Sequence, residues 1–151
     1  MNKNEIKFSR DLAVAQYIHD QLYEFNLRHT GGEKLDIKLN PADIGGIFYI
    51  SNAAAPGGIA GGIVFKVIPD GLYADYFWLS DLVRGQGLGI KIMNALKDYA
   101  VSHGYKSIAL HTAGYQAPKF YEKNGFELQS CDGVADSSPE VTYHYIWYTK
   151  R

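Results

Sequence analysis

A glycine-rich run in the middle of the chain, Arg84-Gly85-Gln86-Gly87-Leu88-Gly89, has residue types that can bind an anion. Residues 73–80 before it are aromatic and apolar enough to form a strand. After it, apolar residues recur at three- and four-residue spacing from Leu88 to Ala100, which is typical of a helix with one buried face. The first N–H groups of a helix have no intrahelical partner and point, with the helix dipole, at any anion placed there. Because glycine keeps no side chain between backbone and ligand, the run predicts a phosphate site at residues 85–90.

The spacing within the run excludes two familiar phosphate loops. A P-loop requires Lys-Ser/Thr after its last glycine, whereas this chain continues with Ile90-Lys91. The dinucleotide fingerprint G-x-G-x-x-G also fails, because the glycines here follow G-x-G-x-G. The pattern that fits is R-x-x-G-x-G.

A second motif, Ala117-Pro118-Lys119-Phe120-Tyr121-Glu122-Lys123-Asn124-Gly125-Phe126, lies downstream. Pro118 favours the first turn of a short helix, and Gly125 can end that helix in the left-handed conformation. Phe126 then begins a strand that extends to Cys131. A further strand is expected at residues 106–111, after a helix end at Gly104.

Together the two motifs resemble the signatures of the GNAT superfamily of N-acetyltransferases, R-x-x-G-x-G and A-x-x-F-Y-E-K-x-G-F, and the resemblance covers residues 73–131. It implies an α/β fold with a mixed, mostly antiparallel central sheet flanked by helices. It also implies direct transfer of an acetyl group from acetyl-CoA, the co-substrate, to a primary amine of a small molecule, peptide or protein, without a metal.

The same resemblance implies a cofactor site. The loop amides would hold the CoA pyrophosphate, Arg84 would support the loop or neutralise phosphate, and the strand edge at 77–79 would pair with the pantetheine amides. These expected cofactor-binding residues are Phe77, Trp78, Leu79, Arg84, Gly85, Gln86, Gly87, Leu88, Gly89, Ile90 and Gln116. One departure from the family is Gly114, which stands where many members have an asparagine that contacts the cofactor; Gln116 is the candidate substitute.

Tyr121 matches the family tyrosine that protonates the departing CoA thiolate. A phenol suits this role because its ordinary pKa, about 10, is near that of a thiol. The alternative is that Tyr121 is only a packing residue beside Phe120. The general base stays open among five residues near the central strands, Tyr73, Asp75, Tyr76, Asp81 and His111, and a chain of water molecules that could serve instead.

The first half of the chain predicts the supporting elements. We expect a short strand at 6–8, a helix capped by Ser9 with an apolar stripe from Leu12 to Phe25, and loops from Leu27 to Asn40 over the acceptor site. Strands are expected at 44–51 and 59–68, with a last strand at 141–149.

Composition predicts one domain spanning residues 1–151, because 46% hydrophobic residues can supply a core. The single cysteine, Cys131, and the polar N-terminus without a signal peptide or membrane-length apolar run predict a cytoplasmic protein with no membrane partner. A net charge of −1 argues against nucleic-acid binding. The acceptor amine and a homodimer stay open. Two other classes also remain: an acyl-CoA sensor without turnover, and a nucleotide-binding α/β domain that shares only the glycine loop.

Overall fold

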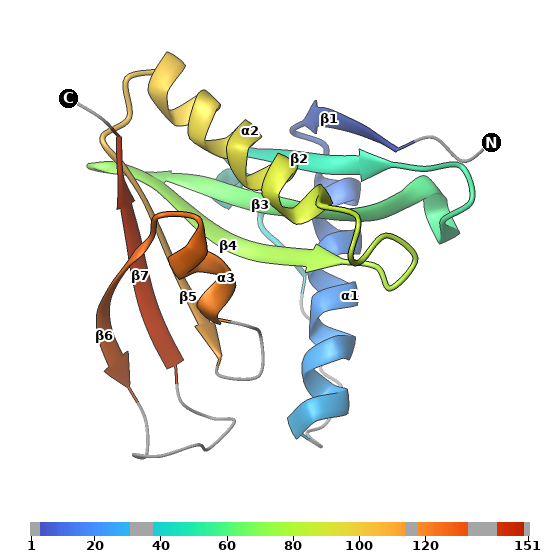
Figure 1. The fold of residues 1–151 in the computed structure, drawn as a ribbon. Coiled ribbons are helices and arrows are strands. Elements are labelled where there is room, and N and C mark those ends of the chain that lie inside the picture. Colours follow the sequence, from blue (N-terminus) through green and yellow to red (C-terminus); the bar gives the residue numbers. More distant parts are fainter. Residues whose placement is uncertain (1–3, 31–37, 114–117, 133–141, 150–151) are drawn as a thin grey trace.

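The computed structural model describes residues 4–30, 38–113, 118–132 and 142–149 (Figure 1). In chain order, its elements are β1 (Glu5–Ser9), α1 (Leu12–Thr30), the 3-10 helix η1 (Pro41–Asp43), β2 (Gly46–Ser51), the 3-10 helix η2 (Pro56–Gly58), β3 (Ile59–Ile68), β4 (Gly71–Leu79), α2 (Leu88–Ser102), β5 (Ser107–Ala113), α3 (Pro118–Lys123), β6 (Glu127–Asp132) and β7 (Thr142–Tyr148).

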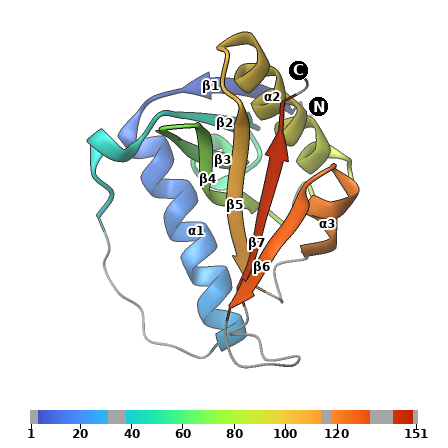
Figure 2. The ribbon, with the colours of Figure 1, turned by 90° about the vertical axis from the view of Figure 1, so that its left-hand side faces the viewer.

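The strands form one seven-stranded sheet in the order β1-β2-β3-β4-β5-β7-β6. Neighbouring strands are antiparallel except β4 and β5, which run parallel. α1 lies on one face of the sheet, and α2 and α3 lie on the other (Figure 2). This confirms the predicted class, a mixed and mostly antiparallel sheet flanked by helices.

Two apolar clusters, one on each face, hold these layers together. On the α2 side, Ile92 and Leu96 pack in a large cluster with Ile63 of β3. On the α1 side, Ile18 packs in a smaller cluster with Val64. Ile63 and Val64 serve opposite faces because successive side chains of a strand alternate. Burying each side chain of this size stabilises the fold by about 1.5–3 kcal/mol.

α1 differs from the prediction at both ends. Its N-cap is Asp11, whose Oδ1 accepts the N–H of Ala13 at 2.9 Å; the predicted cap, Ser9, instead accepts the N–H of Asp11, also at 2.9 Å. The loop expected from Leu27 is wrong for residues 27–30, which continue the helix to Thr30. No proline or glycine interrupts the chain before Gly31, so nothing ends the helix at Leu27.

The other helices agree with the sequence more closely. α2 begins after Gly87 and ends before Gly104, which has a positive φ of 76° as a helix-ending glycine should. No helix within the described ranges is long and apolar enough to cross a membrane.

The parallel pair β4 and β5 opens the sheet. The two strands pair only at residues 72–74 with 108–110, and they separate beyond Ala74 (Figure 1). The register of β3 against β4 shifts between Val64 and Phe65, which makes Asp75 an extra, bulged residue. The edge of β4 after the bulge therefore has no β5 partner.

Candidate active site

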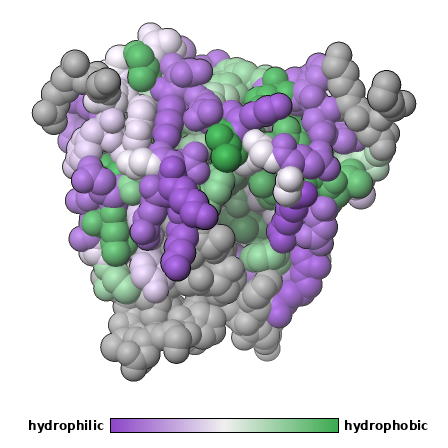
Figure 3. Space-filling view, viewed as in Figure 1, coloured by the Kyte–Doolittle hydropathy of each residue, from purple (hydrophilic) through white to green (hydrophobic). Residues whose placement is uncertain are grey.

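A pocket of about 590 Å³ occupies the space where β4 and β5 separate. In the space-filling view the surface between α3 and α1 is hollowed, with hydrophobic residues recessed between hydrophilic rims (Figure 3). Its walls come from α1, β4, β5, α3 and the start of β7: Leu22, Phe25, Asn26, Ala74, Asp75, Tyr76, Phe77, Trp78, Leu79, Arg84, Leu110, His111, Thr112, Phe120, Tyr121 and Thr142.

The glycine-rich run enters α2 beside this pocket. Gly85 and Gly87 have φ of 79° and 74°, the left-handed region that favours glycine, and a Cβ at either would meet nothing within 4 Å. Gly89 has a different role: a Cβ there would lie 3.2 Å from Leu79 and 3.4 Å from Phe120. The first two glycines therefore shape an open loop, and the third allows α2 to pack closely on β4 and α3.

The Arg84 side chain connects this loop to the sheet through a hydrogen bond. Its Nε donates to the carbonyl oxygen of Leu79 at 3.2 Å, and its Nη1 lies 3.1 Å from Oδ1 of Asp81. The guanidinium also sits 5.1 Å from the ring centroid of Phe25, which joins the loop to α1 across the pocket. Both expected roles, loop support and a positive charge beside the glycines, are compatible with this position.

The three expected pantetheine-binding residues of β4 differ in which of their groups, backbone or side chain, can face the pocket. Ser80 donates its N–H to Ala60 of β3 at 2.9 Å, and backbone direction alternates along a strand. Trp78 therefore turns its backbone toward β3, whereas Phe77 and Leu79 turn theirs toward the edge that β5 has left. Trp78 can offer the pocket only its side chain.

The remaining expected cofactor residues lie around the loop. The side chain of Leu88 is buried and that of Ile90 is 49% exposed. Both residues belong to the first turn of α2, where their backbone N–H groups can bind an anion. Gln86 is exposed and donates from Nε2 to the Leu82 carbonyl at 3.3 Å. Gln116 lies outside the described residues, as does Gly114.

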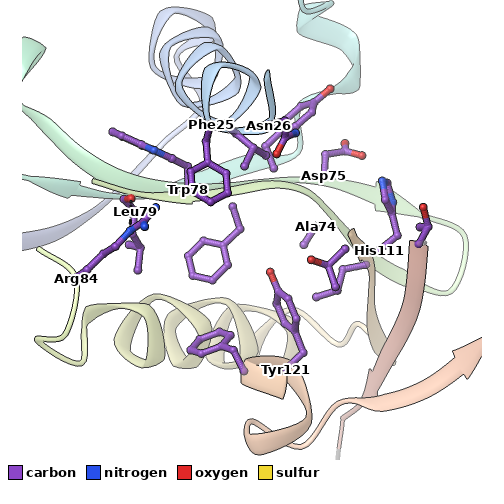
Figure 4. A pocket seen from close by; sticks show the side chains of 16 residues that line it. Phe25, Asn26, Ala74, Asp75, Trp78, Leu79, Arg84, His111 and Tyr121 are labelled. Atoms are coloured by element: carbon purple, nitrogen blue, oxygen red, sulfur yellow. Dashed lines mark hydrogen bonds between the residues drawn. The ribbon is translucent and has the colours of Figure 1, made fainter. Parts of the chain in front are cut away.

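Tyr121 lies on α3, and its side chain is only 8% exposed. Its ring packs against Phe77, Phe126 and Tyr145, with ring centroids 6.4, 5.9 and 6.0 Å away. Figure 4 shows its hydroxyl pointing into the pocket between the Arg84 end and the His111 end. Burial raises the pKa of the phenol well above its ordinary value, so it stays protonated at neutral pH.

Two sets of hydrogen bonds hold α3 in place. Gly125 has a φ of 87°, the left-handed helix end that the sequence predicted. The Phe126 N–H donates to the Tyr121 carbonyl at 3.0 Å and the Gly125 N–H to the Glu122 carbonyl at 3.1 Å, which together form a Schellman motif. Tyr145 of β7 donates its hydroxyl to Glu122 Oε2 at 2.6 Å. Tyr121 is thus fixed from the C-terminal end of its own helix and from the sheet.

The five candidate residues for the general base lie in different places relative to the pocket. Asp75 and His111 line the pocket end away from Arg84, where Figure 4 shows them near each other. Tyr73 is not among the pocket-lining residues, but its hydroxyl is hydrogen-bonded to His111 Nδ1. Tyr76 also lines the pocket, whereas Asp81 is exposed, pairs with Arg84 and does not contribute to the walls.

Several wall residues were not singled out by sequence reasoning. Leu22 and Phe25 belong to the apolar stripe of α1, which predicted only core packing. Asn26, Thr112 and Thr142 gave no signal, because their place in the pocket depends on how α1, β5 and β7 meet. Within the described ranges, no three His, Cys, Asp or Glu residues are grouped to hold a metal ion.

Comparison with known proteins agrees with this architecture. A family model described as the acetyltransferase (GNAT) family matches residues 12–126. Blasticidin-S acetyltransferase of Streptomyces morookaense is 31% identical over 91 residues, 60% of this chain. The match covers 65% of that relative, so the chain spans slightly less than two thirds of its length.

Solved structures share the fold. A Lactobacillus plantarum protein assigned as an N-acetyltransferase superposes with a TM-score of 0.74 at 16% identity, over 99% of this chain and 100% of that chain. A Bacillus anthracis protein assigned as a streptothricin acetyltransferase, solved in complex with acetyl coenzyme A, gives a TM-score of 0.56 at 25% identity. That match covers 68% of this chain and 61% of the other.

Proposed function

The chain belongs to the acetyltransferase (GNAT) family of acyltransferases, and from this premise we propose that it transfers the acetyl group of acetyl-CoA directly to a primary amine. The observation that carries the proposal is one pocket whose walls include Arg84, which adjoins the glycine loop, Tyr121, whose hydroxyl points into the pocket, and a polar end at Asp75 and His111. A donor held at the first and an acceptor held at the last would meet beside Tyr121.

The residues around the loop fit acetyl-CoA. The N–H groups from Gly85 to Ile90 would hold its pyrophosphate, because Gly85 and Gly87 leave the loop open to close approach. The unpaired edge of β4 at Phe77 and Leu79 would accept the pantetheine amides as a strand accepts a neighbour. The Arg84 guanidinium supplies positive charge beside the loop.

Tyr121 would act as the general acid. As the amine attacks the thioester carbonyl and the C–S bond breaks, the sulfur takes the electron pair and needs a proton. The phenol is protonated at neutral pH, and its hydroxyl faces the pocket, so it can donate that proton without a solvent molecule. Fixed positions for donor and acceptor would supply much of the remaining acceleration.

The acceptor we propose is a small cationic amine or a peptide amine. The polar end of the pocket carries the Asp75 carboxylate, which can attract an ammonium group. The names of two similar proteins, a blasticidin-S and a streptothricin acetyltransferase, make those two antibiotics the first amines to test.

The test is CoA thiol release with a panel of amines: blasticidin S, streptothricin, spermidine, a peptide with a free N-terminus and a peptide with an internal lysine. Mass spectrometry of the amine product checks each thiol signal. Stabilisation by acetyl-CoA without acetylation of any amine would favour an acyl-CoA sensor. Stabilisation by NAD or ATP but not by CoA would favour a nucleotide-binding domain.

A further inference from the structure

We propose that His111 removes the proton from the acceptor ammonium before the attack, and that Tyr73 positions its ring. This inference rests on the proposed function, because it assigns the base for the same acetyl transfer. It concerns the pocket end opposite the glycine loop, where β4 and β5 begin to separate.

The placement of His111 is suited to this role. The residue belongs to β5, lines the pocket and remains accessible to solvent, so a proton can arrive from the acceptor and leave to water. Its Nδ1 lies 2.5 Å from the hydroxyl oxygen of Tyr73, on the neighbouring strand β4. If Nδ1–H donates to that oxygen, the lone pair is on Nε2, the nitrogen that can accept a proton.

Charged and titratable groups face His111 from three other strands. Tyr73 and Asp75 come from β4, Lys66 from β3, and His144 from β7, where it is the register partner of His111 with ring centroids 6.0 Å apart. Partial burial, His144 and Lys66 lower the pKa of His111, and Asp75 opposes them. The net direction is downward, so the ring is neutral at pH 7 and can act as a base.

The other candidates are less suited. Burial raises the pKa of Asp75 above its ordinary value, and Lys66 Nζ, 3.7 Å away, opposes that rise. A carboxylate is ordinarily a weaker base than an imidazole, so we assign Asp75 to attracting the acceptor ammonium. Burial raises the pKa of Tyr76, which keeps its phenol protonated. Asp81 pairs with Arg84 outside the pocket.

The protons balance across the reaction. His111 takes one proton from R–NH3⁺ and becomes an imidazolium, and the neutral amine forms the C–N bond. The C–S bond breaks with its electron pair on sulfur, which takes the proton of Tyr121; the second proton of the attacking nitrogen restores that phenol. His111 then releases its proton to solvent, so each turnover yields amide, CoA thiol and one proton.

The test compares His111→Gln with wild type in single-turnover acetylation, from pH 6 to the pKa of an amine that wild type acetylates in the panel. We expect the variant to be slower by about 100-fold at pH 7. The deficit should shrink as the pH approaches the pKa of the amine, because a growing fraction of the acceptor is then already neutral when it binds and needs no base. His103→Gln is the control, since His103 is exposed and stacks on Tyr99 of α2.

A deficit of the same size at every pH, or no deficit, overturns the assignment of His111. Tyr73→Phe tests the positioning role: the imidazolium loses the acceptor of its Nδ1–H, so the acid limb of the profile and the ¹⁵N titration of the His111 ring should both move to lower pH. An unmoved titration would show that Tyr73 does not position the His111 ring. If wild type itself acetylates no amine, the proposed function fails, and this inference falls with it.

Discussion

At the scale of single residues, burial changes the chemistry expected of Tyr121. The sequence predicts an acid matched to a thiol, with a pKa near the ordinary value for a phenol. The nearly complete burial raises that pKa, so any fall in rate from loss of the phenolic proton moves to higher pH than the sequence predicted. The phenol is a weaker acid in the resting protein, but it is protonated across the whole neutral range.

Asp75 gives a residue-scale prediction about the acceptor. Asp75→Asn removes the negative charge at the polar end of the pocket while keeping the size of the side chain. We expect the KM for a cationic amine to rise by roughly 10–100-fold, since a hydrogen bond to a charged group contributes about 1.5–3 kcal/mol. The KM for acetyl-CoA should change little, because the glycine loop lies at the other end.

Steady-state kinetics with each substrate varied in turn measures this split. Asp98→Asn is the matched control, since Asp98 is exposed on α2 and does not line the pocket. Equal changes in the two KM values, or none, would remove Asp75 from acceptor binding.

At the scale of elements, the end of α3 links stability to activity. Gly125 ends this helix with a φ of 87°, and Gly104 ends α2 with a φ of 76°, so alanine is strained by about 1–2 kcal/mol at either position. Both variants should lower the melting temperature. Only Gly125→Ala should also slow acetyl transfer. The helix end at Gly125 lets the Phe126 N–H donate to the carbonyl of Tyr121, so a strained end would displace the proposed acid.

Thermal melting and single-turnover rates, taken below both transitions, test this pair. If the two variants lose activity equally, the helix end at Gly125 does not determine the position of Tyr121.

The loop before α2 allows a second element-scale test. Asn and Asp both tolerate the left-handed conformation of Gly87, so Gly87→Asn and Gly87→Asp differ mainly in charge. We expect acetyl-CoA to raise the melting temperature of wild type and, to a smaller extent, of the Asn variant. The Asp variant should not respond, because its carboxylate repels the pyrophosphate; equal responses of Asp and Asn would contradict the placement of the phosphate site.

The elements also show what a sequence can predict. The helix-ending roles of Gly104 and Gly125 were predictable, and both glycines have the positive φ that such an end favours. The packing role of Gly89 was not predictable, because it depends on contacts with Leu79 and Phe120 from two other elements. The bulge at Asp75 has no local signal at all, since it is a register shift between two strands.

At the scale of the whole molecule, the pocket follows from one topological feature. A single parallel pair inside a mostly antiparallel sheet separates after residues 72–74, and the layers on both faces close around the opening. The order of the elements along the chain and the mixed, mostly antiparallel class of the sheet were predictable through the two motifs and their resemblance to a family. The grouping of His111 with Tyr73 and Asp75 was not, because the parallel pairing and the divergence of β4 and β5 create it.

The central claim, acetyl transfer with Tyr121 as the acid, is tested most directly by Tyr121→Phe in single-turnover acetylation. The variant keeps the ring and its packing, so its melting temperature and its KM for acetyl-CoA should change little, as should those of the control Tyr105→Phe beside α2. We expect the chemical step to be slower by roughly 10²–10⁴-fold in Tyr121→Phe alone. A Tyr121→Phe enzyme with the wild-type single-turnover rate would contradict this claim and leave Tyr121 a packing residue.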